Sequence, residues 1–247
     1  MVLELDVIRS ELLITITLVD AILENVCGIL HKIDKLLIPL LEISPQVICL
    51  SEHHLRSDEL HNINLSPYML GAHYCRQAYK QGGVVIFVTN EIQFHTIDLA
   101  HFNKEKDLEV CALKISLLHA NLITICIYRS PLWNFKFFIN QVEAVLNSIY
   151  KASTYIILCG DFNINHLEAS KRNSQLQALL ASFNLFSTVT FPTRTAMNSS
   201  TLIDNIYLDT DSCNYTVYPL INGLSDHDAQ IIEILNFFHI NPKKSIN

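Results

Sequence analysis

Five polar clusters interrupt an otherwise apolar sequence, and each lies where a run typical of a β-strand ends. Four of them carry a carboxylate: Glu52 ends one run, Asp161 follows a second, Asp204 lies within a third and Asp226 belongs to the fifth cluster. A carboxylate that leaves water must be paired, hydrogen-bonded or bound to a metal ion. These positions therefore predict a metal ion or acid–base chemistry. The simpler alternatives are a surface glutamate, a turn capped by Asp161 and an edge-strand aspartate.

An amide and a phenol could act beside these carboxylates. Asp161 and Asn163 are two residues apart, so their side chains share one side of an extended backbone. The amide of Asn163 can donate to a phosphate oxygen without the repulsion of a second carboxylate. Tyr128 can donate to phosphate in the same way, and Arg129 adds a local positive charge. These donors suit a phosphate ester, whereas an Asx turn and ordinary tyrosine packing explain them without chemistry.

The fifth cluster contains an adjacent carboxylate and imidazole, Asp226 and His227, after a turn at Gly223. Histidine titrates near neutral pH and can serve as a general base or as a charged contact to phosphate. Asp204, a charge within an apolar run, could orient a histidine. A solvated turn is the simpler alternative. The sequence has no Walker loop, no GxGxxG and no GxSxG motif, which excludes the usual nucleotide-binding and α/β-hydrolase signatures.

Strands and a few helices must position these clusters. Helical spacing predicts a helix over 135–149, a shorter one over 176–183, and one over 29–41 with a bend at Pro39. Many strands with few helices predict sheets packed face to face with helices outside. Runs rich in β-branched residues predict strands at 46–50, 83–89, 110–115, 122–128, 155–159, 203–208, 215–218 and 230–235.

Composition restricts the class of protein. The chain has 247 residues, of which 50% are hydrophobic and 17% charged, which excludes a disordered protein. The net charge of −7 excludes nucleic-acid binding through a globally basic surface, so such a role needs a local site. Seven scattered cysteines suit a reducing interior. The apolar stretch 12–23 lacks a basic flank and is too short to span a membrane, so we expect a packed helix or strand and no membrane contact.

The order of the five clusters resembles the endonuclease/exonuclease/phosphatase superfamily. The closer likeness is to the apurinic-like endonuclease domain of non-LTR retrotransposons. The resemblance implies an α/β fold, a DNase I-like four-layered α/β sandwich of two mostly antiparallel sheets flanked by helices. It places this domain at 21–240, after an N-terminal extension of 1–20 and before a tail of 241–247. The matching segments are 25–26, 32–34, 47–52, 82–84, 128–131, 160–163, 192–194, 200–204 and 224–227.

The resemblance also implies a role for each residue. Asp161 would handle the proton of the attacking water or of the leaving oxygen, and Asp204 would orient His227. Tyr128 and Asn163 would hold the scissile phosphate. A divalent ion, Mg²⁺ or Mn²⁺, would lie among the metal ligands, which are Glu52, Asn25 and Asp226. Further substrate contacts would come from Arg129, Arg194 and Ser200.

We therefore expect a Mg²⁺-dependent phosphodiester hydrolase, namely a DNA endonuclease of retrotransposon origin that nicks target DNA for reverse transcription. Its partners would be DNA and, in a full-length element, a reverse transcriptase domain, which this sequence does not contain. It would work inside the cell, in the nucleus if it acts on chromosomal DNA. Two alternatives remain open: a phosphatase or phosphodiesterase acting on a small or lipid phosphate, and a catalytically inactive degenerate copy.

Overall fold

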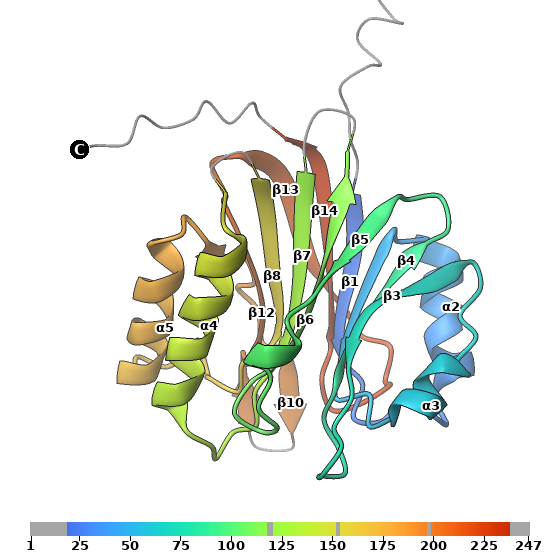
Figure 1. The fold of residues 1–247 in the computed structure, drawn as a ribbon, viewed down its shortest axis with the longest axis horizontal. Helices are drawn as coiled ribbons and strands as arrows, with labels where there is room; N and C mark the ends of the chain where they lie inside the picture. The colour runs from blue at the N-terminus through green and yellow to red at the C-terminus, as the bar shows by residue number, and fades with distance from the viewer. Residues whose placement is uncertain (1–18, 118–120, 152–153, 197–198, 238–247) are drawn as a thin grey trace, which may run out of the picture.

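Two six-stranded β-sheets packed face to face form the centre of the protein (Figure 1). The computed structural model describes residues 19–117, 121–151, 154–196 and 199–237. The first sheet has the order β13 (Cys213–Leu220), β14 (Ala229–Phe237), β1 (Val19–Asn25), β2 (Val47–Ser51), β4 (Val84–Thr89) and β3 (Tyr68–Tyr74). The second has the order β5 (Phe94–Ile97), β6 (Glu109–Ser116), β7 (Asn121–Tyr128), β8 (Thr154–Asp161), β12 (Asp204–Leu208) and β9 (Phe186–Ser187).

Helices complete the outer layers. Figure 1 shows α2 (Ile33–Ile43) and α3 (Ser57–His61) beside the first sheet, and α4 (Phe135–Ile149) and α5 (Lys171–Ala181) beside the second. A short 3-10 helix, η1 (Ala100–Phe102), precedes β6, and a small hairpin joins β10 (Arg194–Ala196) to β11 (Ser199–Thr201). This arrangement confirms the predicted four-layered α/β sandwich. No helix within the described ranges is long and apolar enough to cross a membrane.

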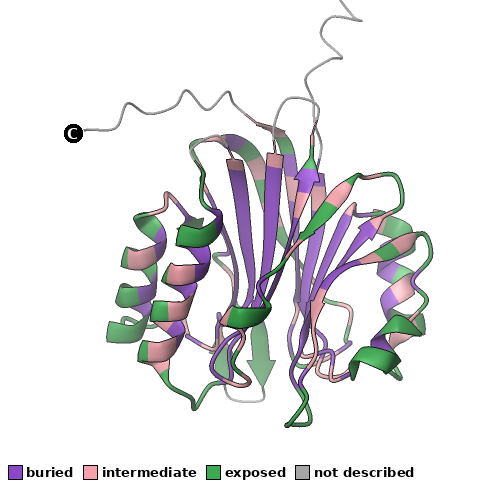
Figure 2. Ribbon diagram, in the orientation of Figure 1, coloured by how far each residue is buried: buried purple, intermediate pink, exposed green. Residues whose placement is uncertain are grey.

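The central strands are buried on both faces. In β2, β4, β7 and β8 nearly every residue is buried, because one face packs on the opposite sheet and the other on helices (Figure 2). One apolar cluster fills the space between the sheets, and two more lie under the helix pairs. This explains why these strands are continuously apolar rather than alternating.

Two parallel strand pairs decide where the strand ends lie. Among the described strands, all pairs are antiparallel except β1 with β2 and β7 with β8. A parallel pair needs a crossover, and α2 and α4 supply these two crossovers. The carboxyl ends of each parallel pair therefore meet at the same edge of the sandwich.

The predicted elements compare closely with this structure. All eight predicted strands are present, and α4 has the predicted bounds. Helix α5 begins at Lys171, earlier than predicted, because the side chain of Ser170 caps it by accepting from the Asn173 N–H at 3.1 Å. Pro39 lies inside α2 at a buried position. The extension 1–20 lies outside the described residues except for the start of β1, and so does the tail 241–247.

Candidate active site

The ends of six strands bring the predicted catalytic residues to one edge of the sandwich. Asn25 ends β1 and Glu52 follows the parallel β2. On the other sheet, Tyr128 ends β7 opposite Asp161 at the end of β8. The antiparallel β12 begins at Asp204, which also pairs with Asp161, and His227 comes just before β14. The edge lies beside the β10–β11 hairpin, at the lower side of Figure 1.

Asp161 is the centre of this group and is only 1% exposed. The Asn25 Nδ2 donates to its Oδ2 at 2.8 Å, which links the two sheets. Asn163 contributes its backbone N–H to Oδ1 at 2.8 Å and its Nδ2 to Oδ2 at 3.1 Å. Burial and the nearby charges of Asp204 and Glu52 hold the pKa of Asp161 well above its usual range. A carboxyl with a raised pKa is suited to exchange protons near neutral pH.

His227 forms a buried pair with Asp204. The histidine Nδ1 lies 2.8 Å from Asp204 Oδ2, and no hydrogen-bond partner for Nε2 exists among the described residues. Burial lowers the pKa of His227, but the hydrogen bond and charge of Asp204 outweigh burial and raise the pKa to about 9. The imidazole is therefore protonated at neutral pH, and its Nε2–H can donate to an anionic oxygen.

Replacing Asp204 by Asn should lower the pKa of His227 from about 9, because the charge of Asp204 and its charged hydrogen bond are lost, while burial and the charges of Asp161 and Asp226 remain. In the wild type the folded-state pKa lies above the unfolded one. Protonated His227 therefore raises the free energy of unfolding by on the order of 3 kcal/mol below pH 6.5. This stabilisation disappears as the pH rises through about 9. NMR titration of His227 in EDTA, with urea unfolding at each pH, measures both effects. A wild-type His227 that titrates at the same pH as in Asp204→Asn would contradict this interpretation.

Glu52 and Tyr128 form a second pair at the same edge. Burial raises the pKa of Glu52, but hydrogen bonds from His54 and Tyr128 outweigh it and leave the pKa below its usual value. His54 Nε2 lies 3.2 Å from Glu52 Oε2. Burial and the charge of Glu52 raise the pKa of the Tyr128 phenol. At neutral pH Glu52 is thus a carboxylate and Tyr128 a donor.

The donor set at this edge fits a divalent cation. Asp161 and Asp204 offer one pair of ligand atoms, and Cys27 and Asp226 offer another, each pair within 4.8 Å of His227, whose protonated imidazole is not itself a ligand. Carboxylates crowded in this way disfavour each other's charge, which a cation relieves. The hard oxygen atoms of these carboxylates match the preference of Mg²⁺ and Mn²⁺.

Other predicted residues lie at the rim of the site. Asp226 is partly exposed, and its Oδ2 accepts from Arg194 Nε on β10 at 2.7 Å. Ser200 is exposed on β11, opposite Thr195 of the same hairpin. Both Nδ2 protons of Asn163 are used inside the protein, by Asp161 and by the Arg129 carbonyl at 2.7 Å. A contact from Asn163 to phosphate would have to replace one of these bonds.

The predicted contact between Arg129 and substrate is wrong. Arg129 is 0% exposed. Its guanidinium donates to the backbone carbonyls of Phe162, Asn163, Pro131 and Trp133 at 3.2–3.4 Å, on the α4 side of the sheet. Arg129 therefore holds the loops around Asp161 in place.

Sequence reasoning missed two residues of the site, Cys27 and His54. The Sγ of Cys27 lies 3.4 Å from Asn25 Oδ1 and 3.8 Å from Asp226 Oδ1. His54 contacts Glu52. Cys27 comes two residues after Asn25, and His54 comes two residues after Glu52. Both Asn25 and Glu52 are predicted metal ligands, so this spacing could have identified Cys27 and His54 from the sequence.

A model of the Endonuclease/Exonuclease/phosphatase family matches residues 22–227. The chain belongs to this family. The match confirms the superfamily resemblance carried by the strand-end clusters. Members of the endonuclease/exonuclease/phosphatase family are typically metal-dependent phosphodiester hydrolases. Comparison with curated protein sequences gives no significant match.

Solved structures of the family share this fold. The endonuclease domain of TRAS1, a telomere-specific non-LTR retrotransposon, is 14% identical with a TM-score of 0.69 over 88% of this chain and 98% of that one. The AP endonuclease LMAP from Leishmania major is 13% identical, with a TM-score of 0.69 over 89% and 88%. The 3′ phosphatase NExo from Neisseria is 15% identical, with a TM-score of 0.63 over 87% and 99%.

Proposed function

We propose that this protein is a Mg²⁺-dependent DNA endonuclease of retrotransposon origin that nicks target DNA for reverse transcription. The observation that carries the proposal is the buried group around Asp161, in which Asn25, Asn163 and the Asp204–His227 pair converge from both sheets. The structural likeness to the TRAS1 endonuclease domain supports the choice of DNA. The proposal includes action in the nucleus and a reverse transcriptase domain as partner in a full-length element.

The reaction is the attack of water on phosphorus. A new P–O bond forms to the water oxygen, and the bond to the leaving alkoxide breaks. The carboxylate form of Asp161 takes the proton of the attacking water, and the raised pKa makes that carboxylate a stronger base. The protonated His227 donates to a phosphate oxygen as negative charge grows on it. The Tyr128 hydroxyl does the same after it exchanges its hydrogen bond to Glu52 for one to the phosphate.

The proposed metal ligands are Glu52, Asn25 and Asp226. A bound Mg²⁺ would supply Lewis-acid polarisation of the phosphate and stabilise the leaving alkoxide. Glu52 remains ionised at neutral pH, as a ligand must. The amide of Asn25 keeps Asp161 in place from the opposite sheet.

Phosphatase or phosphodiesterase action on a small or lipid phosphate is the second candidate. The net charge of −7 favours it, because a strongly acidic protein repels long polyanions. The similar structures also include the 3′ phosphatase NExo, which supports phosphatase action, although NExo was solved with a product DNA hairpin and not with a small or lipid phosphate. Both candidates use the same site and differ in the loops that select the substrate.

Nicking of supercoiled plasmid tests the proposal. The wild type should convert it to open circles with Mg²⁺ and not with EDTA, and Asp161→Ala and His227→Ala should both fail. Asp211→Asn, at an exposed turn, is the matched control and should remain active. Phosphate release from small esters without nicking would favour the second candidate. Inactivity on both substrates despite cooperative melting would identify an inactive copy.

Arg194 on β10 provides a check of DNA contact. Its side chain is 45% exposed and lies beside Asp226, so it can reach a phosphate near the site. Arg194→Ala should weaken DNA binding equally for different sequences and reduce the slope of log K against log salt by about 1. Fluorescence anisotropy in EDTA at several salt concentrations measures both. An unchanged slope would mean that Arg194 touches no phosphate.

A further inference from the structure

A lysine between two exposed aromatic rings forms a distinct surface beside the active site. Lys106 Nζ lies 3.3 Å from the ring centroid of Tyr79 and 4.7 Å from that of Trp133. Tyr79 is 45% exposed and Trp133 is 43% exposed. We call Tyr79, Lys106 and Trp133 the aromatic platform. It combines two stacking surfaces with a positive charge.

A short series of contacts connects the aromatic platform to the proposed catalytic residues. The backbone N–H of Ser130 donates to the Lys106 carbonyl at 3.0 Å. Arg76 Nη2 donates to Ser130 Oγ at 3.0 Å, and the Arg76 guanidinium lies 5.6 Å from the ring centroid of Tyr128. The platform is therefore within a few side chains of the proposed scissile phosphate.

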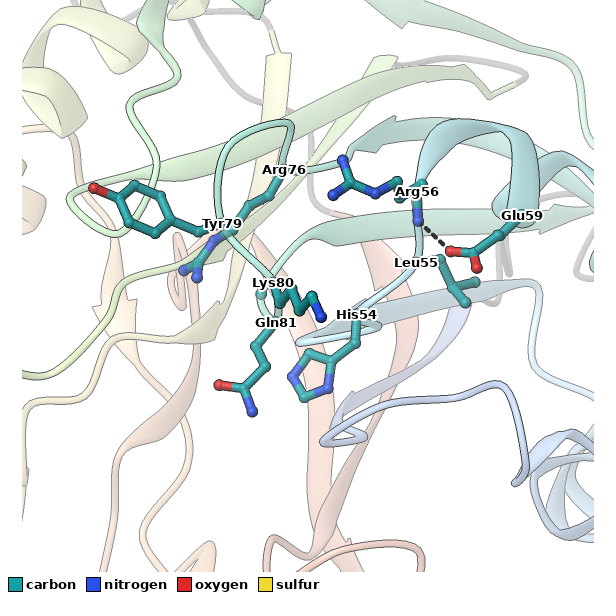
Figure 3. Close-up of a pocket in the computed structure, with 9 residues that line it drawn as sticks. His54, Leu55, Arg56, Glu59, Arg76, Tyr79, Lys80 and Gln81 are labelled. Atoms are coloured by element: carbon teal, nitrogen blue, oxygen red, sulfur yellow. Dashed lines mark hydrogen bonds between the residues drawn. The ribbon is translucent and has the colours of Figure 1, made fainter.

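A cationic pocket of about 270 Å³ extends the platform toward Glu52. Figure 3 shows Tyr79, Lys80 and His54 among the residues that line it. The one carboxylate of this lining, Glu59, accepts a hydrogen bond from the Arg56 backbone at 2.8 Å. Lys80 and Arg56 are exposed at this pocket, and their positive charges make it suited to bind a phosphate group.

The loop that carries Tyr79 is held in its conformation. The carboxylate of Glu105 accepts hydrogen bonds from the backbone N–H groups of Gln77, Ala78 and Tyr79 at 2.6, 3.0 and 2.9 Å. A pre-organised loop loses little conformational entropy when a ligand binds. These bonds also occupy Glu105, one of the two acidic residues next to Lys106 in the sequence; the other, Asp107, pairs with Lys104 at 2.7 Å.

We propose that the aromatic platform binds an unpaired strand of DNA that flanks the cleaved phosphodiester, with bases stacked on Tyr79 and Trp133. A paired base has both faces covered by its neighbours, so an exposed aromatic ring stacks well only on an unpaired one. Lys106 and Lys80 would contact the phosphates of that strand. The substrate class is thus DNA with a single-stranded segment beside the site. The inference rests on the proposed function only where it places this strand beside a phosphodiester that the protein cleaves.

Tryptophan fluorescence tests the inference directly, because Trp133 is the only tryptophan in the chain. In EDTA, which prevents hydrolysis, a short oligothymidylate should quench this fluorescence and bind at least about tenfold more tightly than a blunt duplex of equal length. Tyr79→Leu should weaken binding of the single strand about 5- to 100-fold. Tyr150→Leu, an exposed tyrosine at the end of α4, is the matched control and should bind like the wild type.

Three results would overturn the inference: no quenching by the single strand, equal affinity for the duplex, or unchanged affinity in Tyr79→Leu. The test is separate from that of the proposed function. Plasmid nicking without preference for single strands would leave the endonuclease intact and refute the aromatic platform. Binding of single strands without nicking would support the platform and refute the endonuclease.

Discussion

Asp161→Asn should reduce DNA nicking by at least about 10³-fold, since it removes the group that accepts the proton of water. The same change should alter the stability at pH 7 by no more than about 1–3 kcal/mol, because relief of a buried charge opposes the loss of a hydrogen bond that Asp161 accepts. The folded-state pKa of Asp161 lies above the unfolded one, so the wild type loses stability as the pH rises above the ordinary aspartate range. An uncharged amide of equal size avoids that loss. A rate loss far larger than the change in stability is the behaviour of a catalytic group.

Plasmid nicking and thermal unfolding in EDTA at pH 7 measure these two effects on one preparation. Asp211→Asn, at an exposed turn, controls for the loss of one carboxylate and should nick at the wild-type rate. A nicking rate in Asp161→Asn within about tenfold of the wild type would show that another group carries the proton. A large fall in Tm would show that Asp161 mainly holds the two sheets together.

Gly160→Ala should prevent stable folding. Gly160 has φ +143°, which side chains rarely allow, and an added Cβ would lie 1.8 Å from the Ile127 carbonyl oxygen. Ile127 pairs with Gly160 in the parallel β7–β8 ladder, so neither backbone can move away. Strain and overlap together should cost on the order of 5 kcal/mol, which is comparable to the whole stability of a domain.

Urea unfolding and soluble yield measure this effect. Gly223→Ala is a matched control, because that glycine also has a positive φ of +67° but has no atom within 4 Å of the added Cβ. It should cost only about 1–2 kcal/mol. If Gly160→Ala were as stable as Gly223→Ala, the close approach of β7 and β8 would be wrong.

The strongest sequence signals gave the correct elements. Strands β2 and β7 are continuously apolar, and α4 has a clear 3/4 spacing, so all three were predicted near their observed bounds. Strand β3 was missed because it lies at the edge of its sheet and exposes polar and apolar residues in no regular alternation. An edge strand such as β3 buries too few of its residues to show a regular pattern.

The sequence predicted some residues of the site correctly and misassigned others. Strand ends carry the catalytic carboxylates, and their order along the chain was visible. Arg129 was misassigned because successive residues of a strand face opposite sides. Tyr128 points toward the site. Arg129 points toward α4, where its guanidinium donates hydrogen bonds to backbone carbonyl groups. In the aromatic platform, Lys106 lies 27 positions after Tyr79 and 27 positions before Trp133. Only the tertiary structure reveals that these residues are in contact.

Binding of Mn²⁺ tests the central claim that strand-end oxygen atoms converge on one divalent ion. Electron paramagnetic resonance reports free Mn²⁺, so bound ion appears as a loss of signal. The wild type should bind one Mn²⁺ per chain, and Glu52→Gln, which keeps the size of the side chain, should weaken that binding at least about tenfold. Equal Mn²⁺ affinity in the wild type and in Glu52→Gln would contradict the claim.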